Sequence, residues 1–425
     1  MSINLGLQRM KPLMESLLAP QKTFKVFHVA GTNGKGSVCA YLSSILYKSS
    51  IPVGRFTSPF LLEPRDSIFV NESPISQALF ADVKKLVEQT AQRAGVRPTD
   101  FELLTATAME VFNRKQLDVA VIEVGVGGKE DATNIEYKRR GVLGTIITRV
   151  GLDHQNLLGN SIKEIALQKA GIMRAKTLCT VSGDNVPEVL STIETQASSL
   201  DQISVVKPDE ILSQDDGVYL ETDSYGKIKL SETPLNGDYQ YMNLACAVRA
   251  LDRVAKLLPT VTRSTIEAGI REVQWQGRLQ FISAEPFGGN EDRKILLDGA
   301  HNVQAASSLG KFVNENLRGD EKITWVMALS GNREATEILS LLGRPGDKFY
   351  AVGFSPVDTM SWVVPQDLTA LNLAAKDLDL DAVPTEGLSL QTVISNALSS
   401  CSAPVVICGS LYLISDVLRL TKSTL

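Results

Sequence analysis

The first half of the chain alternates apolar runs with stretches in which hydrophobic residues recur every three or four positions. Short apolar runs predict buried strands, and the longer recurring pattern predicts helices with one buried face. The predicted strands are residues 24–30, 118–124, 142–148 and 177–182, and the predicted helices are residues 37–48, 76–94, 102–114, 161–170 and 186–198. Strands that alternate with helices in this way indicate a mainly parallel sheet covered by helices.

The second half begins with a polar stretch, residues 208–232, whose Asp216-Gly217 and Tyr225-Gly226 pairs are typical of tight turns between antiparallel strands. A helix is predicted at 239–257 and a loop at 287–292. The alternation of strands and helices then restarts, with strands predicted at residues 294–297, 324–329, 348–352 and 404–408. We therefore expect two α/β domains, a mainly parallel sheet domain at 1–280 and a smaller Rossmann-like domain at 281–425.

Composition excludes two classes of partner. Hydrophobic residues make up 44% of the chain and charged residues 21%, as is typical of a soluble globular protein. The net charge of -5 gives no general attraction to nucleic acid or to an anionic membrane, so an anionic substrate needs a local positive site. No apolar run is long enough to cross a bilayer.

The N-terminal stretch and the cysteines indicate where the protein acts. Apolar residues at helical spacing and Glu15 favour a docked N-terminal helix over a transit peptide. The cysteines lack the spacing of a metal site, and reduced thiols are the ordinary state of such residues in the cytoplasm. The five cysteines are Cys39, Cys179, Cys246, Cys401 and Cys408. We expect a cytoplasmic monomer.

A glycine-rich turn, GTNGKGS at residues 31–37, lies between a predicted strand and a predicted helix. Its glycines let the backbone approach a phosphate, and amide N–H groups at a helix start point at an anion. Lys35 adds a positive charge, and the Ser37 hydroxyl can bind Mg²⁺ as in other P-loops. The intervening Gly36 departs from the usual spacing, so an ordinary strand-to-helix connection is the alternative. We interpret the turn as a nucleotide site.

Polar side chains also follow two other predicted strands. Glu123 lies at the end of strand 118–124, where a buried acid is costly unless it is paired or bound to a cation. His154 follows strand 142–148. If these strands are parallel neighbours of the first, both side chains reach the edge of the phosphate turn and could hold a magnesium ion with a hydroxyl. Histidine is an unusual Mg²⁺ ligand, and a turn histidine bonded to backbone groups is an equal alternative.

Two further polar positions have ordinary explanations on the residues alone. Lys169, in the predicted helix 161–170, has the position of a solvated helix lysine. The cluster DGAHN at 298–302 follows strand 294–297 and precedes a helix. It is a second polar cluster at the C-terminal end of a strand, and a helix cap by Asp298 or Asn302 is the alternative.

These separated motifs together resemble the folylpolyglutamate synthase and dihydrofolate synthase family, relatives of the Mur ligases. The matching strings are HVAGTNGKGS (28–37), TSPFL (57–61), FELLT (101–105), EVGVGG with DATN (123–134), LDH (152–154), QKAGI (168–172), QGRL (276–279), LDGAHN (297–302) and CGSLYL (408–413). They occur in the family's order over nearly the whole chain. The resemblance implies a P-loop, Mur-ligase-like first domain that binds ATP, with the substrates in an interdomain cleft.

The resemblance also implies roles for single residues. The ATP-binding set is Thr32, Asn33, Gly34, Lys35, Gly36, Ser37, Asn243, Arg278, Asp298 and His301. The metal set is Ser37, Ser58, Glu123, His154 and Lys169, the pterin set is Phe101, Asp131 and Ala132, and the catalytic set is Lys35, Lys169 and His154. Lys169 is expected as a carbamate that bridges to the second of two Mg²⁺ ions, since a neutral amine captures CO₂ and becomes an anionic ligand.

The implied reaction activates a carboxylate with ATP to an acyl phosphate, which an amine then attacks. Asn33 resembles bacterial and fungal dihydrofolate synthases, and the segment at 66–71 resembles the fungal ones, so we expect dihydropteroate, L-glutamate and ATP as substrates. Extension of a folate's glutamate tail, or both activities, is the alternative, and an inactive nucleotide-binding module is the alternative from another class. Phe60 and Gln168 depart from the family pattern, at a common histidine and a frequent acidic residue.

Overall fold

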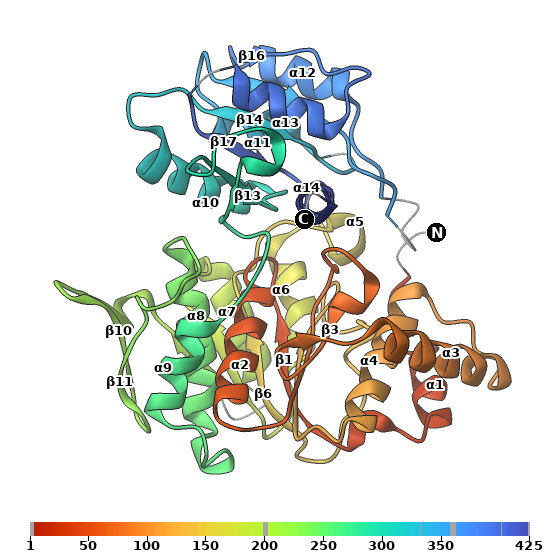
Figure 1. Cartoon of the computed structure of the whole chain (residues 1–425). Coiled ribbons are helices and arrows are strands. Elements are labelled where there is room, and N and C mark those ends of the chain that lie inside the picture. Colours follow the sequence, from red (N-terminus) through yellow and green to blue (C-terminus); the bar gives the residue numbers. More distant parts are fainter. Residues whose placement is uncertain (1–3, 199–202, 332, 358–362, 401, 424–425) are drawn as a thin grey trace. The chain divides into compact units, whose positions relative to one another are not determined.

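A computed structural model describes residues 4–198, 203–331, 333–357, 363–400 and 402–423, which form two compact units (Figure 1). The first unit consists of Ile3–Pro234 and Asp238–Trp275. The second unit consists of Leu235–Gly237 and Gln276–Leu425. Each unit has its own central sheet and its own buried apolar residues.

An eight-stranded sheet forms the centre of the first unit. Its strand order is β4 (Ser73–Pro74), β3 (Ile68–Val70), β2 (Val53–Phe56), β5 (Val119–Glu123), β1 (Lys25–Ala30), β6 (Val142–Ile147), β7 (Leu178–Ser182) and β8 (Ile203–Val206). From β2 to β8 all neighbours pair in parallel, whereas β3 and β4 are antiparallel. Val29 of β1 lies opposite Glu123 and Ile146, so the carboxyl ends of β5, β1 and β6 meet at one edge.

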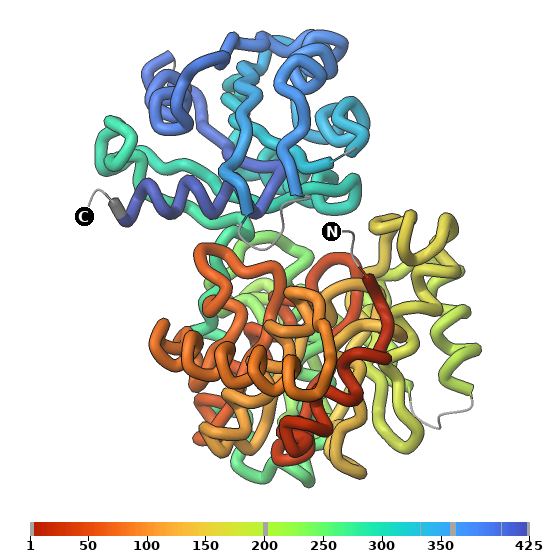
Figure 2. Tube along the Cα trace, turned by 90° about the vertical axis from the view of Figure 1, so that its right-hand side faces the viewer, coloured from red at the N-terminus to blue at the C-terminus, as the bar shows by residue number. Residues whose placement is uncertain are grey.

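Helices cover this sheet in groups that pack against one another. The helices of the first unit are α1 (Met10–Ser16), α2 (Lys35–Lys48), α3 (Gln77–Arg93), α4 (Asp100–Arg114), α5 (Gln155–Leu158), α6 (Ile162–Ala170), α7 (Pro187–Ala197), α8 (Tyr239–Arg253) and α9 (Arg263–Glu272). Helix α2 packs against α8 and α9, while α1 packs against α3 and α4 (Figures 1 and 2). Met10, Val26 and Ile122 share one core with α3 and α4, which confirms the predicted docked N-terminal helix.

A small antiparallel sheet belongs to the first unit. It contains β9 (Ile211–Gln214), β10 (Gly217–Thr222) and β11 (Gly226–Lys229). Gly217 and Gly226 have positive φ angles of 146° and 69° at its two turns. The prediction of short antiparallel strands within 208–232 is therefore confirmed.

The second unit contains a six-stranded sheet. Its strand order is β12 (Gln280–Ser283), β13 (Lys294–Asp298), β17 (Val405–Cys408), β14 (Thr324–Met327), β15 (Lys348–Ala351) and β16 (Asp381–Ala382). Only β12 pairs antiparallel. The helices are α10 (Val303–Val313), α11 (Ala335–Leu342), α12 (Leu368–Lys376), α13 (Leu390–Ser399) and α14 (Leu411–Ser423), and α14, dark blue in Figure 2, packs beside β17 and β13. The expected α/β fold class is confirmed.

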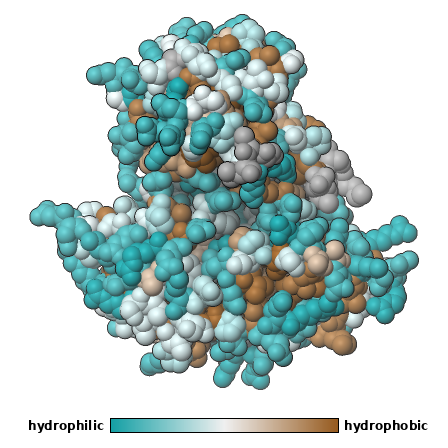
Figure 3. Space-filling view, in the orientation of Figure 1, coloured by the Kyte–Doolittle hydropathy of each residue, from teal (hydrophilic) through white to brown (hydrophobic). Residues whose placement is uncertain are grey.

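Hydrophilic side chains cover most of the face shown in Figure 3. Within the described residues, no helix is long and apolar enough to span a membrane. Cys39, Cys179, Cys246 and Cys408 are free and buried, while Cys401 lies outside the described residues.

Candidate functional site

The glycine-rich turn is held by contacts that leave no room for a side chain. A Cβ added to Gly34, whose φ is 91°, would lie 2.3 Å from Asn243 Oδ1 on α8. At Gly36 the added atom would lie 2.3 Å from the ring of Trp275. Because α8 and Trp275 press directly on the turn, the path of its backbone depends on glycine at both positions. Asn243 was expected near the nucleotide, whereas nothing in the sequence pointed to Trp275.

The beginning of the turn is fastened to the segment that follows β6. The amides of Thr32 and Asn33 donate to Arg149 O at 2.8 and 3.1 Å. The Thr32 hydroxyl accepts from Gly151 N at 2.9 Å and lies 3.0 Å from Gly151 O. These two amides therefore hold the loop in shape, and the ATP-binding role that the resemblance implies for Thr32 and Asn33 stays a prediction.

The amides that face outward belong to the start of α2. The helical ladder begins with Val38 N, which donates to Gly34 O at 3.0 Å. The amides of Lys35, Gly36 and Ser37 therefore precede the first helical bond and point out of the helix N-terminus. Together with the positive end of the helix dipole they can bind an anion.

A buried acid and a lysine meet beside the turn. Lys35 Nζ donates to Thr32 O at 3.1 Å and lies 3.7 Å from Glu123 Oε1. The other oxygen, Glu123 Oε2, accepts from Ser58 N at 3.2 Å. The Glu123 side chain is buried, and the positive charge of Lys35 offsets part of the cost of burying it. The predicted meeting of Glu123 and the phosphate turn at one sheet edge is confirmed.

Lys169 lies inside the unit rather than on its surface. The residue is only 4% exposed, and its Nζ donates to Gly31 O at 2.8 Å. Burial, with a smaller contribution from the charge of Lys35, lowers the pKa of Lys169 to about 7, while the charges of Asp153 and Asp131 oppose the shift. The interpretation as a solvated helix lysine is therefore wrong. A large share of the amine is neutral near pH 7, which is unusual for lysine.

His154 is fixed at the start of α5 in a left-handed conformation, with φ of 51°. Its amide donates to Asp153 Oδ1 at 2.8 Å, and its carbonyl accepts from Leu157 N at 2.9 Å. Across the described parts of the chain, no three His, Cys, Asp or Glu side chains form a group that could hold a metal ion. A magnesium ion at this edge would therefore depend on hydroxyls, a carbamate and phosphate oxygens as well as on carboxylate.

A buried carboxylate and an aromatic ring flank Gly125, just after β5. A Cβ added to Gly125 would lie 2.4 Å from the Phe101 ring and 3.1 Å from Asp131 Oδ2. Burial raises the pKa of Asp131, although hydrogen bonds from Thr133 and from backbone amides work against this shift. Phe101 also packs on the core, with its ring centroid 6.0 Å from that of Phe56, and its role in pterin binding stays a prediction. Ala132 beside them is buried.

The second unit places its three candidate residues around one loop. Asp298 accepts from Leu279 N and Ala300 N, each at 2.8 Å. Burial raises the pKa of Asp298, and the charge of Arg278 opposes that rise. His301 Nδ1 lies 2.9 Å from Gly299 O. Asp298 thus braces this loop and does not cap α10.

The cap of α10 is the side chain of Asn302, which accepts from Ala305 N at 2.9 Å. The helix-cap alternative for the cluster at 298–302 is therefore correct for Asn302. Arg278, Asp298 and His301 belong to the second unit, whereas the phosphate turn, Glu123 and Lys169 belong to the first.

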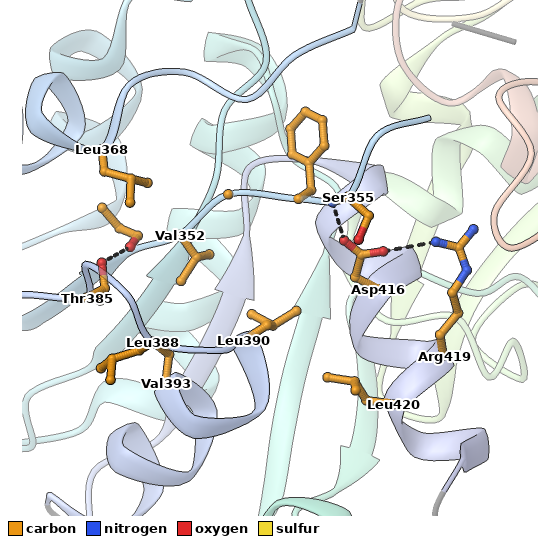
Figure 4. A pocket seen from close by; sticks show the side chains of 13 residues that line it. Val352, Ser355, Leu368, Thr385, Leu388, Leu390, Val393, Asp416, Arg419 and Leu420 are labelled. Atoms are coloured by element: carbon orange, nitrogen blue, oxygen red, sulfur yellow. Dashed lines mark hydrogen bonds and ion pairs between the residues drawn. The ribbon is translucent and has the colours of Figure 1, made fainter. Parts of the chain in front are cut away.

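The second unit also contains a cavity of about 510 Å³, which is lined by other residues than the candidate site (Figure 4). Its polar groups bond to one another, since Thr385 donates to Ala351 O at 2.6 Å and Asp416 accepts from Ser355 N at 2.7 Å. Asp416 also pairs with Arg419 at 2.9 Å. None of the predicted site residues lines this cavity, so it forms no part of the candidate site.

Comparison with known proteins identifies the family. The protein-family model described as the C-terminal domain of dihydrofolate synthetase matches residues 286–420 of the sequence. A probable dihydrofolate synthetase of Schizosaccharomyces pombe is 38% identical over 426 residues, 99% of each chain. The chain belongs to the dihydrofolate synthase and folylpolyglutamate synthase family.

Two further comparisons extend this result. The dihydrofolate synthetase of Saccharomyces cerevisiae is 36% identical over an alignment of 441 residues that covers 100% of both chains. A solved structure of E. coli FolC in complex with DHPP and ADP matches with a TM-score of 0.82 at 26% identity, over 100% of this chain and 94% of that one. Both agree with the family and fold expected from the motifs.

Proposed function

We propose that this family member is an ATP-dependent ligase that joins L-glutamate to dihydropteroate, giving dihydrofolate, ADP and phosphate. One observation carries the proposal: a helix N-terminus, the Lys35–Glu123 pair and the buried Lys169 occupy one edge of the sheet. Such an edge can bind a triphosphate and stabilise charge that moves between phosphate and carboxylate. Two of the relatives that match over 99% or more of the chain are named as a probable dihydrofolate synthetase and a dihydrofolate synthetase.

ATP is the co-substrate, and residues of the first unit would hold its phosphates. The amides of Lys35, Gly36 and Ser37 point out of the start of α2, and the Lys35 ammonium adds charge to the same place. The side chain of Asn243 lies against the turn at Gly34. Arg278, Asp298 and His301 stay predictions as nucleotide contacts.

The residues at the sheet edge fit a magnesium site. Glu123 is a buried carboxylate with a cation 3.7 Å away, and Ser58 lies beside it. Ser37, Ser58, Glu123 and His154 would hold one Mg²⁺ together with phosphate oxygens. When bound, the ions would neutralise phosphate charge that otherwise repels the incoming carboxylate.

Lys169 would contribute to a second Mg²⁺ as a carbamate. A carbamate forms from a neutral amine and CO₂, and the burial of Lys169 supplies that neutral amine near pH 7. The product is an anion at a place where Lys35 provides the opposite charge. The same burial explains why this lysine, unlike Lys163 on the exposed face of α6, is suited to the reaction.

The chain's own groups would then act in order. Phe101 and Asp131 hold the pterin ring, which places the substrate carboxylate toward the phosphate turn. The carboxylate attacks the γ-phosphorus of ATP, while Lys35 and the α2 amides stabilise the charge that develops on the phosphate oxygens. The glutamate amine next attacks the acyl carbon, and phosphate leaves.

Steady-state turnover tests this proposal. Purified protein with ATP, Mg²⁺, L-glutamate and dihydropteroate should release ADP and phosphate and form dihydrofolate. Turnover only with tetrahydrofolate would replace the assignment by folylpolyglutamate synthase, and comparable turnover with both would make the enzyme bifunctional. ATP binding without glutamate-dependent turnover on any pteroate or folate would indicate an inactive module.

We further propose that the ligase acts as a cytoplasmic monomer. The four described cysteines are free and buried, which suits a reducing compartment. Gel filtration with light scattering would test the monomer, and a mass near twice 46.1 kDa would contradict it.

A further inference from the structure

One histidine lies inside the central sheet of the first unit, and the proposed reaction assigns it no role. His28 is in β1, opposite Ile122 of β5 and Thr145 of β6, and is only 1% exposed. Burial lowers the pKa of His28 to about 3, and the positive charge of Arg174 contributes to this shift. The ring is therefore neutral at any physiological pH, so its role must be that of a hydrogen-bonding group.

A short chain of hydrogen bonds leads from this ring to Asp131. His28 Nε2 lies 2.8 Å from Thr133 Oγ1, and the same hydroxyl lies 2.5 Å from Asp131 Oδ1. Thr133 N also donates to Asp131 Oδ1 at 3.0 Å. All three side chains are buried. Such groups must satisfy one another because water cannot replace a missing partner.

The single proton of the hydroxyl fixes the direction of this chain. A threonine hydroxyl donates once and accepts through its lone pairs. If Thr133 donates to the Asp131 carboxylate, it has no proton left for His28 and must accept from the ring. Neutral His28 then carries its proton on Nε2. The opposite direction requires a proton on Asp131, which would turn that carboxyl from an acceptor into a donor.

The other oxygen of Asp131 lies on the side of Gly125 and Phe101, the second residue proposed to hold the pterin. Asp131 Oδ2 accepts from Val126 N at 2.9 Å and lies next to Gly125, whose added Cβ would also meet Phe101. The amino-pyrimidinone edge of a pterin presents adjacent N–H donors, so it needs an acceptor there. A protonated or rotated Asp131 would present the wrong group.

We propose that His28 is a positioning residue for the heterocyclic substrate: through Thr133 it holds Asp131 in place as an ionised acceptor. The inference rests on the proposed function, because it takes dihydropteroate as the molecule that Asp131 receives. His28 does not touch the substrate. It determines the direction of the two hydrogen bonds that join His28, Thr133 and Asp131.

Nuclear magnetic resonance tests the direction without any substrate. The chain has only three histidines, so ¹⁵N-labelled histidine gives few signals, and His154→Gln and His301→Gln variants assign them. We expect one ring that stays neutral from about pH 5 to about pH 8, in the Nε2–H tautomer. The Nδ1–H tautomer for His28 would overturn the proposal, since Nε2 would then accept from Thr133.

Kinetics test the consequence for the substrate. His28→Leu removes the donor and should raise the KM for dihydropteroate by about tenfold, the effect of one well-placed buried hydrogen bond, with the KM for ATP unchanged. His28→Gln keeps an N–H donor of similar reach and should restore most of the affinity. A KM for dihydropteroate in His28→Leu within about twofold of wild type would overturn the proposal. Equal impairment of the Leu and Gln variants would also do so.

Thr133→Val provides a second route, with Thr180→Val as its matched control. Thr180 is a buried threonine of β7 whose hydroxyl has no hydrogen-bond partner among the described residues. Thr133→Val should raise the KM for dihydropteroate as His28→Leu does, whereas Thr180→Val should leave it unchanged. If both threonine variants behave alike, the proposal fails. Wild type that does not use dihydropteroate contradicts the proposed function instead, and the tautomer measurement is independent of that result.

Discussion

At the residue scale, Lys169 is the position whose interpretation depends most on the fold. Its place in an amphipathic helix is that of an exposed lysine, yet the helix buries this side chain against Gly31. A buried ammonium with one carbonyl partner is costly, so part of the population loses its proton. That change of state makes carbamate chemistry available.

Replacing Lys169 tests its catalytic role. Lys169→Ala should reduce kcat by at least about 100-fold, because a charged group at the phosphate site is lost, while the protein stays folded. Short-chain carboxylates should restore part of the activity by taking the place of the carbamate. Lys163→Ala, on the exposed face of the same helix, is the control and should turn over normally. Near-normal kcat in Lys169→Ala would rule out the carbamate role.

The pKa of Lys169 predicts a pH dependence. The folded pKa, about 7, lies below the ordinary value, so the neutral amine increases as the pH rises through about 7. Carbamate formation needs that neutral form. With ¹³C-bicarbonate, the protein carbamate signal should therefore grow between about pH 6 and about pH 8 and be absent from Lys169→Ala. A signal that stays constant or falls over this interval would contradict the assignment.

Site residues could be predicted where the local sequence indicates their role, and could not be predicted where the role depends on a partner far away in the chain. Glu123 was predictable because an acid at the end of an apolar run needs a cation, and Lys35 lies 3.7 Å away. The use of the Thr32 and Asn33 amides was not predictable, since their acceptor, Arg149 O, is brought to them only by the pairing of β1 with β6. The histidine in β1 gave no signal as a positioning residue, because its partner Thr133 lies 105 residues away.

At the element scale, the strands predicted from apolar runs are those that are buried on both faces, whereas the small antiparallel sheet was predicted from its turns. The predicted strand 118–124 is observed as Val119–Glu123, and all five residues are buried. The strand Val53–Phe56 was missed, since it contains Gly54 and Arg55. Arg55 is nevertheless buried, because it donates to Glu72 at 3.1 Å and its guanidinium lies 4.2 Å from the centre of the Phe69 ring. Those partners come from elsewhere in the chain.

Edge strands and a polar helix were also missed. β8 and β12 are short strands at the edges of their sheets, where partial exposure breaks the apolar run that marks a buried strand. Helix α9 is rich in polar residues, and it packs on α2 through Gly269, whose added Cβ would lie 2.5 Å from Ile45 Cα. A glycine inside a predicted helix ordinarily weakens the prediction, although here it permits the close contact.

A buried ion pair connects elements of the second unit, and it supports a stability prediction. Asp347 accepts from both terminal nitrogens of Arg318 at 2.8 Å and from Trp325 Nε1 at 3.1 Å. Asp347→Asn removes the negative charge and leaves the Arg318 charge buried. The free energy of unfolding of the second unit should fall by about 3–5 kcal/mol.

Urea unfolding followed by tryptophan fluorescence measures this loss, because Trp325 contacts Asp347 directly. Asp377→Asn, at the exposed C-terminal end of α12, is the control and should change the unfolding free energy by less than about 0.5 kcal/mol. An unfolding curve of Asp347→Asn that coincides with that of the control would show that the pair does not stabilise this unit.

At the scale of the whole molecule, the chain divides into two units, and it enters the second unit for a short segment before it returns to the first. Leu235–Gly237 belongs with the second unit, where Asn236 Nδ2 donates to Leu279 O at 2.8 Å, while Asp238–Trp275 returns to the first. Hydrophobic periodicity cannot predict that a segment of three residues belongs to a different unit from its neighbours in the chain. The fold class and the family were nevertheless predictable, because nine motifs keep their order along the chain.

The central claim is that one molecule forms an acyl phosphate on dihydropteroate and then an amide with glutamate. Dihydropteroate labelled with ¹⁸O in its carboxylate tests both steps in a single turnover experiment with mass spectrometry. We predict that one ¹⁸O atom passes to inorganic phosphate for each dihydrofolate formed, since the carboxylate oxygen that attacks ATP leaves with the phosphate. Phosphate released without the label, or label transfer without dihydrofolate, would contradict the account.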